Sequence, residues 1–135
     1  MSTWTHVAGV IRAYGVQNWE SDHDWDSIIG KECLWGSSSE TWKYADEHPE
    51  EYMPCGSEGS LQKSIWVNPD KSDVNAYTIS VFGDLRDWYD VDAIIEWFKK
   101  LVKNKLSVRS AVITVINTQE ETRTWAYNFG EEAET

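Results

Sequence analysis

The stretch from Val108 to Phe129, VRSAVITVINTQEETRTWAYNF, predicts two β-strands joined by a short polar turn. An arginine stands near the start of each strand, Arg109 in the first and Arg123 in the second. Each should point to the core side of its strand, Arg109 with Ala111, Ile113 and Val115, and Arg123 with Trp125, Tyr127 and Phe129. A charge out of water is expensive unless it is paired. The partner of each arginine is therefore either a carboxylate of this chain or a phosphate that the protein captures.

The rest of the chain predicts three more strands and one clear helix. Strands are expected at residues 4–15, 60–68 and 76–83, the first buried on much of both faces and the third ended by Gly83. A proline turn follows residue 68. Asp90 is the expected N-cap of the helix, and its apolar stripe is Val91, Ile94, Ile95, Phe98, Leu101 and Val102. The order predicts an α+β fold, an antiparallel β-sheet covered by one main amphipathic helix.

A long insertion separates the first strand from the second. Residues 17–59 are rich in Trp, Gly, Ser and acidic residues, which is too aromatic for disorder. We expect a structured, loop-rich insertion with short helices near residues 25–29 and 46–52, and insertions of this length usually carry function or contacts. With 135 residues the chain predicts a single domain, 1–135, and residues 130–135 are expected to form a frayed tail.

The charge balance limits the classes of partner. The formal net charge is −11, from 12 Lys and Arg against 23 Asp and Glu. Duplex nucleic acid and anionic membranes call for a basic face, so neither is expected as a partner. No apolar run approaches the ~20 residues of a membrane span, and the first residues lack the pattern of a signal peptide. These observations predict a cytoplasmic protein.

The residues that bind metals or perform catalysis do not form a recognisable set. Cys33 and Cys55, with His23 and His48, lack the paired spacing of a zinc site, so no metal is predicted. Two reduced thiols are expected, with a disulfide as the alternative. Cys55 with His48 is a weak candidate for a nucleophile and its base. His6 has no second histidine motif, and there is no G-x-S-x-G or glycine-rich phosphate loop. We therefore expect no catalytic residues, no cofactor and no enzyme.

A second candidate binding stretch is SVFGDLRDW, residues 80–88. Phe82 beside a glycine offers a projecting ring, Asp84 a ribose-type acceptor, Arg86 an anion partner and Trp88 a stacking face. The alternative is a loop that leads into the helix and is packed by its own aromatic residues.

The two strand-start arginines should lie far apart within one chain. Antiparallel neighbours begin at opposite ends, so six to eight residues separate Arg109 from Arg123, roughly 20–26 Å at ~3.3 Å per residue. One pyrophosphate is much shorter than this distance. If the two share a ligand, the second arginine must come from a symmetry mate, which predicts a homodimer or a higher homo-oligomer with equivalent pockets.

Three stretches resemble the first family of phage Thoeris anti-defence proteins: WTHVAGVI at residues 4–11, GSEGSLQKSIWVNPD at 56–70 and YTISVFGDLRDWYDVDAIIEWFKKL at 77–101. The strands with Arg109 and Arg123 add to the similarity, which runs from Trp4 to about Tyr127 and is weakest over the insertion. The resemblance implies a sponge that binds glyco-cyclic ADP-ribose made by TIR-domain proteins without cleaving it. Such a protein acts in the cytoplasm of the bacterial host cell and keeps Thoeris immunity silent.

The resemblance also implies roles for individual residues. Phe82 would pack on the adenine, Arg109 and Arg123 would bind phosphate, and the pockets would lie between protomers. An alternative from another class is an acidic, nucleic-acid-mimicking inhibitor of a host defence protein, which the net charge of −11 suggests. That alternative predicts carboxylates spaced over one exposed face and assigns no role to Arg109 or Arg123.

Overall fold

A six-stranded antiparallel sheet forms the body of the molecule, in the order β4-β5-β1-β6-β7-β8. The structure is a computed structural model that describes residues 3–16, 24–67, 76–119 and 122–135. The strands are β1 (Trp4–Val16), β4 (Gln62–Val67), β5 (Tyr77–Arg86), β6 (Leu106–Asn117), β7 (Arg123–Asn128) and β8 (Glu131–Glu134). The first strand lies in the middle, between β5 and β6. The predicted α+β class and the predicted hairpin of residues 108–129 are confirmed.

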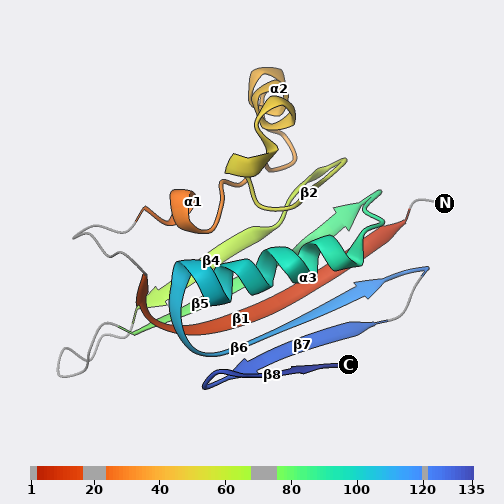
Figure 1. Cartoon of the computed structure of the whole chain (residues 1–135). Coiled ribbons are helices and arrows are strands. Elements are labelled where there is room, and N and C mark those ends of the chain that lie inside the picture. The colour runs from red at the N-terminus through yellow and green to blue at the C-terminus, as the bar shows by residue number, and fades with distance from the viewer. Residues whose placement is uncertain (1–2, 17–23, 68–75, 120–121) are drawn as a thin grey trace.

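One helix, α3 (Val91–Lys100), lies across one face of this sheet (Figure 1). Asp90 caps it as predicted, because its side chain accepts a hydrogen bond from the backbone N–H of Ala93. The helix continues into a wider π-type turn, Leu101–Lys105, before β6 begins. The predicted apolar stripe is buried against the sheet: Val91, Ile94, Ile95, Phe98, Leu101 and Val102.

The close approach of α3 to the sheet depends on Gly9 in β1. A Cβ atom at this position would lie 2.9 Å from Cγ2 of Val81 and 3.0 Å from Cε1 of Phe98. The Phe98 ring is fully buried and meets the edge of Trp125, with ring centroids 5.9 Å apart. The absent side chain therefore makes room for the ring at the centre of the core.

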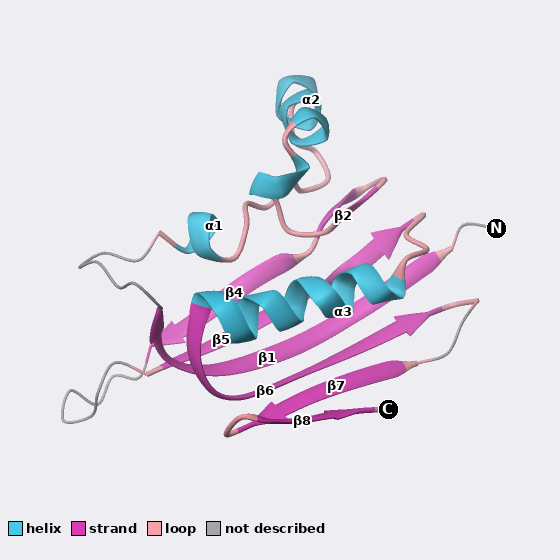
Figure 2. Ribbon diagram, in the orientation of Figure 1, coloured by secondary structure: helices cyan, strands magenta, loops and turns pink. Residues whose placement is uncertain are grey.

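The opposite face of the sheet is open. Val7, Ile11 and Ala13 of β1 are buried under α3, but Ala8, Val10 and Tyr14, which point the other way, are exposed. The prediction that this strand is buried on both faces was wrong, because no element among the described residues covers the second face (Figure 2). This surface is called the open face below.

The described part of the insertion, residues 24–59, is structured, as predicted. It contains α1 (Trp25–Ile28), α2 (Ser39–Glu47), a 3₁₀ turn (Pro49–Glu51) and the small hairpin of β2 (Cys55–Gly56) with β3 (Gly59–Ser60). It stands at the β4 side of the sheet, with α2 farthest out (Figure 1). Ile29 and Met53 join the hydrophobic core of the sheet. The helix expected near residues 46–52 is displaced, because Ser38 caps an earlier helix and Pro49 starts a separate turn.

Two strand boundaries differ from the prediction. The third predicted strand does not stop at Gly83: β5 continues to Arg86, since glycine adopts the φ of +149° found there without strain. The expected frayed tail is instead the edge strand β8, which pairs with β7 from Trp125 to Asn128. The predicted proline turn after residue 68 and His23 lie outside the described residues. Across the described part of the chain, no helix is both long and apolar enough to cross a membrane.

Replacing Gly9 by valine should destabilise the fold by roughly 1–3 kcal/mol, the usual effect of overpacking a core. The added side chain would collide with Val81 and Phe98. Urea unfolding followed by circular dichroism measures the change. The matched control is Ala8→Val on the exposed neighbour, which should shift the midpoint little. Equal stability of the two variants would contradict the packing of Phe98 on Gly9.

Candidate functional site

Arg109 lies on the open face, because two register shifts interrupt the pairing of β1 with β6. Arg12 pairs with Ser110 and Ala13 pairs with Val108, so Arg109 is an extra residue on its strand, and Tyr14 is the extra residue on the other. A bulge of this kind changes the side to which the following residues point. The prediction that Arg109 shares a side with Ala111, Ile113 and Val115 was therefore wrong, and its side chain is exposed.

The Arg109 guanidinium is held by aromatic rings. Its Cζ lies 4.9 Å from the ring centroid of Tyr14 and 5.6 Å from that of Phe129. Phe129 stands in a turn with φ +48°, and its backbone N–H donates to the carbonyl of Arg109 at 2.8 Å. In the described part of the chain, no carboxylate lies within 4 Å of this guanidinium. Among the described residues, the side chains that hold this guanidinium are therefore aromatic and not anionic.

Arg123 is in the opposite situation. It lies on the helix side of the sheet, as predicted, and its guanidinium forms ion pairs with Asp92 of α3 and Glu134 of β8. It also lines a hollow with Asp90 and Asp92, which would repel a phosphate. For this arginine, the question of a carboxylate or a phosphate partner is answered in the free protein: carboxylates of the same chain bind it.

The predicted distance between the two arginines agrees with the observed register. Arg123 pairs with Val115, which is six residues beyond Arg109, or roughly 20 Å at ~3.3 Å per residue. Arg109 and Arg123 also point to opposite faces, which the sequence did not indicate. The structure therefore does not bring these two side chains together within one chain.

The residues of the stretch 80–88 divide between the two sides of the molecule. Phe82 lies in the middle of β5, on the open face, and is 39% exposed. Asp84 is on the same face, where its Oδ1 lies 2.6 Å from Nδ1 of His6. Sequence reasoning missed this pair, because the two residues are 78 positions apart. In the described chain no Ser, Thr or Cys side chain hydrogen-bonds to the His6 ring, so the pair has no nucleophile to activate.

Arg86 and Trp88 contact the insertion and α3. Arg86 donates through Nη1 to Glu58 at 2.5 Å, which joins the end of β5 to the small hairpin. Trp88 donates through its indole N–H to the carbonyl of Asp90 at 2.7 Å. The alternative prediction, a loop packed only by its own aromatic residues, therefore does not describe Arg86 or Trp88. Neither residue is near Arg109 in the sheet.

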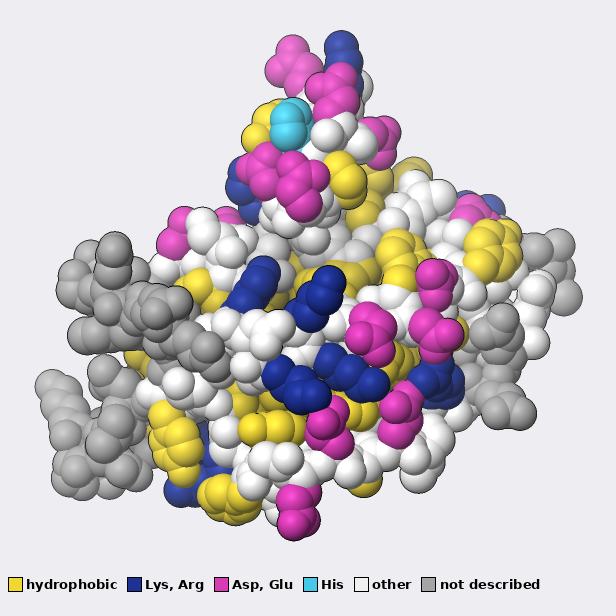
Figure 3. Space-filling view, in the orientation of Figure 1, with side chains coloured by type: hydrophobic (Ala, Val, Ile, Leu, Met, Phe, Trp, Pro, Cys, Tyr) yellow, Lys and Arg dark blue, Asp and Glu magenta, His cyan; other side chains and the backbone are white. Residues whose placement is uncertain are grey.

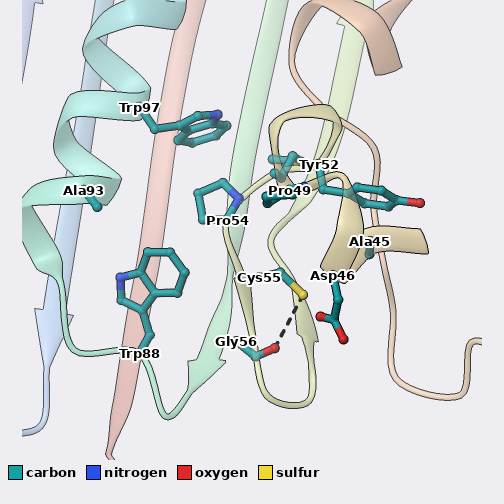
Figure 4. A pocket seen from close by; sticks show the side chains of 11 residues that line it. Ala45, Asp46, Pro49, Tyr52, Pro54, Cys55, Gly56, Trp88, Ala93 and Trp97 are labelled. Carbon is teal, nitrogen blue, oxygen red and sulfur yellow. Dashed lines mark hydrogen bonds between the residues drawn. The ribbon is translucent and has the colours of Figure 1, made fainter. Parts of the chain in front are cut away.

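A cavity of about 370 Å³ separates α3 from the insertion. Trp88, Ala93 and Trp97 form one wall, and the segments around Pro49 and Pro54 form the other (Figure 4). Asp46 and Cys55 supply side-chain polar groups, and none of the described lining residues is Lys or Arg. The cavity offers the apolar surface of two indoles along one wall, but its described lining offers no cation to a phosphate. Trp97 was missed in the sequence because it stands outside the apolar stripe of its helix.

The cysteines of the insertion are not paired with histidine. Cys33 is buried and Cys55 half-buried, both as free thiols, and Cys55 Sγ donates to the carbonyl of Gly56 at 3.4 Å. His48 instead stacks on Tyr44, with centroids 4.2 Å apart. Among the described residues, no group of three His, Cys, Asp or Glu side chains could hold a metal ion.

Comparison of the chain with protein-family models, curated proteins and solved structures finds no match.

Replacing Glu134 by glutamine should lower stability at pH 7 and have a smaller effect at pH 3. The hydrogen bond from Arg123, and then the one from Lys99, lower the pKa of Glu134. A lowered pKa in the folded state stabilises the protein above the ordinary glutamate pKa of about 4.3, and this stabilisation is lost as the pH falls through the lowered value. Urea midpoints at both pH values test this. The control is Glu131→Gln, an exposed neighbour without a described ion pair, and an identical pH dependence in both variants would contradict the assignment.

The Cys55 thiol should react slowly in the native protein. Burial raises its pKa to about 11, so at pH 7.5 its thiolate fraction should be on the order of a hundredfold below that of a free cysteine. Iodoacetamide labelling of a Cys33→Ser variant, with and without urea, isolates this thiol. Rapid labelling of the native variant would show that Cys55 is an activated nucleophile after all.

Proposed function

We propose that this protein sequesters cyclic ADP-ribose isomers of the glyco-cyclic type, made by TIR-domain proteins, and so blocks Thoeris immunity in the cytoplasm of an infected bacterium. The observation that carries the proposal is Arg109, whose guanidinium lies exposed between two aromatic rings without a described carboxylate partner. In a chain with a net charge of −11, such a cation is suited to a small phosphorylated ligand. The resemblance of the sequence to the Thoeris anti-defence family names the ligand class.

The open face also carries Phe82, the ring proposed to stack on adenine. Phe82 pairs with Ala8, which pairs with Thr114, five residues from Arg109. Two strand spacings and five residues give a separation of roughly 19 Å, too far for the base and the phosphates of one small nucleotide. One protomer alone therefore does not present both groups to the same ligand.

A second copy, packed against the open face, would solve this problem. Large apolar residues are exposed on this face: Val10, Trp66, Phe82, Val112 and Ile116. Ser80, Val10 and Val112 lie side by side in one row across the sheet. A two-fold axis along this row would place Phe82 of one copy over the end of the other copy's sheet that carries Arg109. The proposal thus includes a homodimer with two equivalent pockets. In this arrangement Arg123, on the other face, has no direct contact with the ligand.

The acidic-mimic alternative is less well supported by the helix side of the molecule. Lys and Arg side chains are interleaved with Asp and Glu around α3 (Figure 3). Ion pairs of Lys99 and Lys103 with β8 neutralise several of these carboxylates. A nucleic-acid mimic requires unpaired carboxylates at regular spacing over one face, and this face is mixed.

Purified protein incubated with glyco-cyclic ADP-ribose, freed of unbound ligand and then heat-denatured, should release intact ligand. Mass spectrometry of the supernatant separates the alternatives: altered ligand would indicate an enzyme, and no ligand would favour the mimic. Arg109→Ala should reduce the affinity at least about tenfold, because a charge-assisted hydrogen bond is lost. Phe82→Ala should reduce it by roughly 1–3 kcal/mol, the usual contribution of base stacking.

Light scattering provides the control for the shared pocket. The protein should have the mass of two chains or more, and Lys103→Ala, which lies on the helix side away from the open face, should still bind ligand. A monomer both with and without ligand would refute the dimeric pocket.

A further inference from the structure

Arg109 has a neighbour of the same kind on the adjacent strand. Arg12 of β1 pairs with Ser110, the residue next to Arg109, so the two arginines stand at the same end of the sheet. Arg12 is half-buried, and alternation along β1 directs its side chain to the open face with Val10 and Tyr14. Adjacent strands are about 4.8 Å apart, so the backbones of the two arginines are close neighbours. In the free protein the Arg12 head group lies toward Thr78 and Trp66 and the Arg109 head group toward Tyr14 and Phe129, so a ligand between them would be reached by a rotation of these long side chains.

Arg12 is held by neutral groups, as Arg109 is. Its Nη1 donates to Oγ1 of Thr78 at 2.9 Å, and its Cζ lies 5.9 Å from the ring centroid of Trp66. Within the described ranges no carboxylate approaches this guanidinium to within 4 Å. One hydrogen bond to a hydroxyl uses one of the five N–H donors of an arginine and leaves the others for a ligand.

The surroundings of the pair form a continuous row across the sheet. Five residues on five adjacent strands lie in register on the open face: Trp66, Thr78, Arg12, Ser110 and Asn128. The row begins with an exposed indole, continues through a hydroxyl, a guanidinium and a second hydroxyl, and ends with an amide. Arg109, with Tyr14 and Phe129, lies just beyond Ser110. Aromatic rings thus flank the two cations on both sides.

We infer that Arg12 and Arg109 together form a site for a pyrophosphate-bridged nucleotide, with one guanidinium on each phosphate and Trp66 beside the ligand as a stacking surface. The inference deepens the proposed function, on which its choice of nucleotide rests. Two phosphates joined by one oxygen match two cations on neighbouring strands, whereas Arg109 and Arg123 are too far apart within one chain. Both arginines that bind the two phosphates thus come from the same protomer. The second copy supplies only Phe82, the ring proposed to stack on the base.

The neutral hydrogen-bonding residues of the row have a role in this site. Thr78 holds Arg12 in place through a hydrogen bond. Ser110 is the register partner of Arg12 and the sequence neighbour of Arg109, and its hydroxyl can donate to a phosphate oxygen. On the same row the nearest described carboxylate belongs to Glu131, which pairs with Asn128 at the far edge. Among the described residues, the end of the open face that carries the arginines therefore presents two cations without a carboxylate within 4 Å of either.

The test is calorimetric titration of the wild type and of Arg12→Ala, Arg12→Lys and Arg109→Ala with two probes, glyco-cyclic ADP-ribose and inorganic pyrophosphate. Arg12→Ala should weaken the binding of both probes at least about tenfold, as should Arg109→Ala. Arg12→Lys should recover only part of the affinity, because lysine keeps the charge but loses the bidentate fork. Lys103→Ala, which removes one positive charge on the helix side, should bind like the wild type.

The two probes separate this inference from the proposed function. Loss of pyrophosphate binding in Arg12→Ala, with no binding of glyco-cyclic ADP-ribose to the wild type, would support the site and overturn the sponge. Binding of glyco-cyclic ADP-ribose by Arg12→Ala within twofold of the wild type, with loss in Arg109→Ala, would keep the sponge and overturn the role of Arg12. Failure of the wild type to bind either probe at millimolar concentration would overturn both. Circular dichroism of each variant confirms that it is folded.

Discussion

The contact between Phe98 and Gly9 sets the architecture of this protein. The helix α3 lies on one side of a six-stranded sheet. The Phe98 ring of this helix reaches the backbone of the central strand β1 only because Gly9 has no side chain. Burial on this side is nearly complete, and Ile11, Ile79, Ile94 and Ile113 have almost no exposed surface. All of the packing stabilisation from α3 is thus on one side, and the opposite face is left for other interactions.

The register shifts between β1 and β6 decide what that open face can bind. Each strand has one extra residue there, Tyr14 on one and Arg109 on the other, and their side chains contact each other. Bulges are common next to binding sites because they redirect a side chain without ending the strand. In this sheet the result is a guanidinium above an aromatic ring, next to the in-register row that contains Arg12. The separation of a structural face from the proposed ligand face therefore depends on a local irregularity of the backbone.

The sequence predicted those features that depend on local periodicity. The α3 stripe, its Asp90 cap and the order of the main elements along the chain agree with the structure, because apolar spacing and capping are local signals. The side to which Arg109 points could not be predicted. One extra residue moves the neighbouring side chains to the other face of the sheet, and such a bulge has no marker in the sequence. The apolar residues on both sides of β1 suggested burial on both faces, yet Val10 is 44% exposed, because sequence spacing does not reveal how many helices cover a sheet.

The site was harder to predict than the fold for the same physical reason. Phe82 was found as a projecting ring and Arg109 as a strand-start arginine on the core side, but Arg12, Trp66 and Tyr14 join the site only through pairing between distant strands. Arg123 looked equivalent to Arg109 in the sequence. One of its carboxylate partners, Asp92 of α3, is remote from it in the sequence. The other, Glu134, belongs to the edge strand β8, whose sequence pattern is weak.

The acidic edge strand β8 limits how copies of this protein can associate. A strand with unpaired backbone groups is a template for another strand, and a sheet that adds copies at its edge grows into an open polymer. In β8, three of the four residues are glutamates, and charged side chains on an edge strand disfavour the addition of another strand. The charged strand β8 therefore disfavours growth of the sheet by edge-to-edge pairing. Association through the flat face, which closes on itself after two copies, is the route that this charge distribution leaves open.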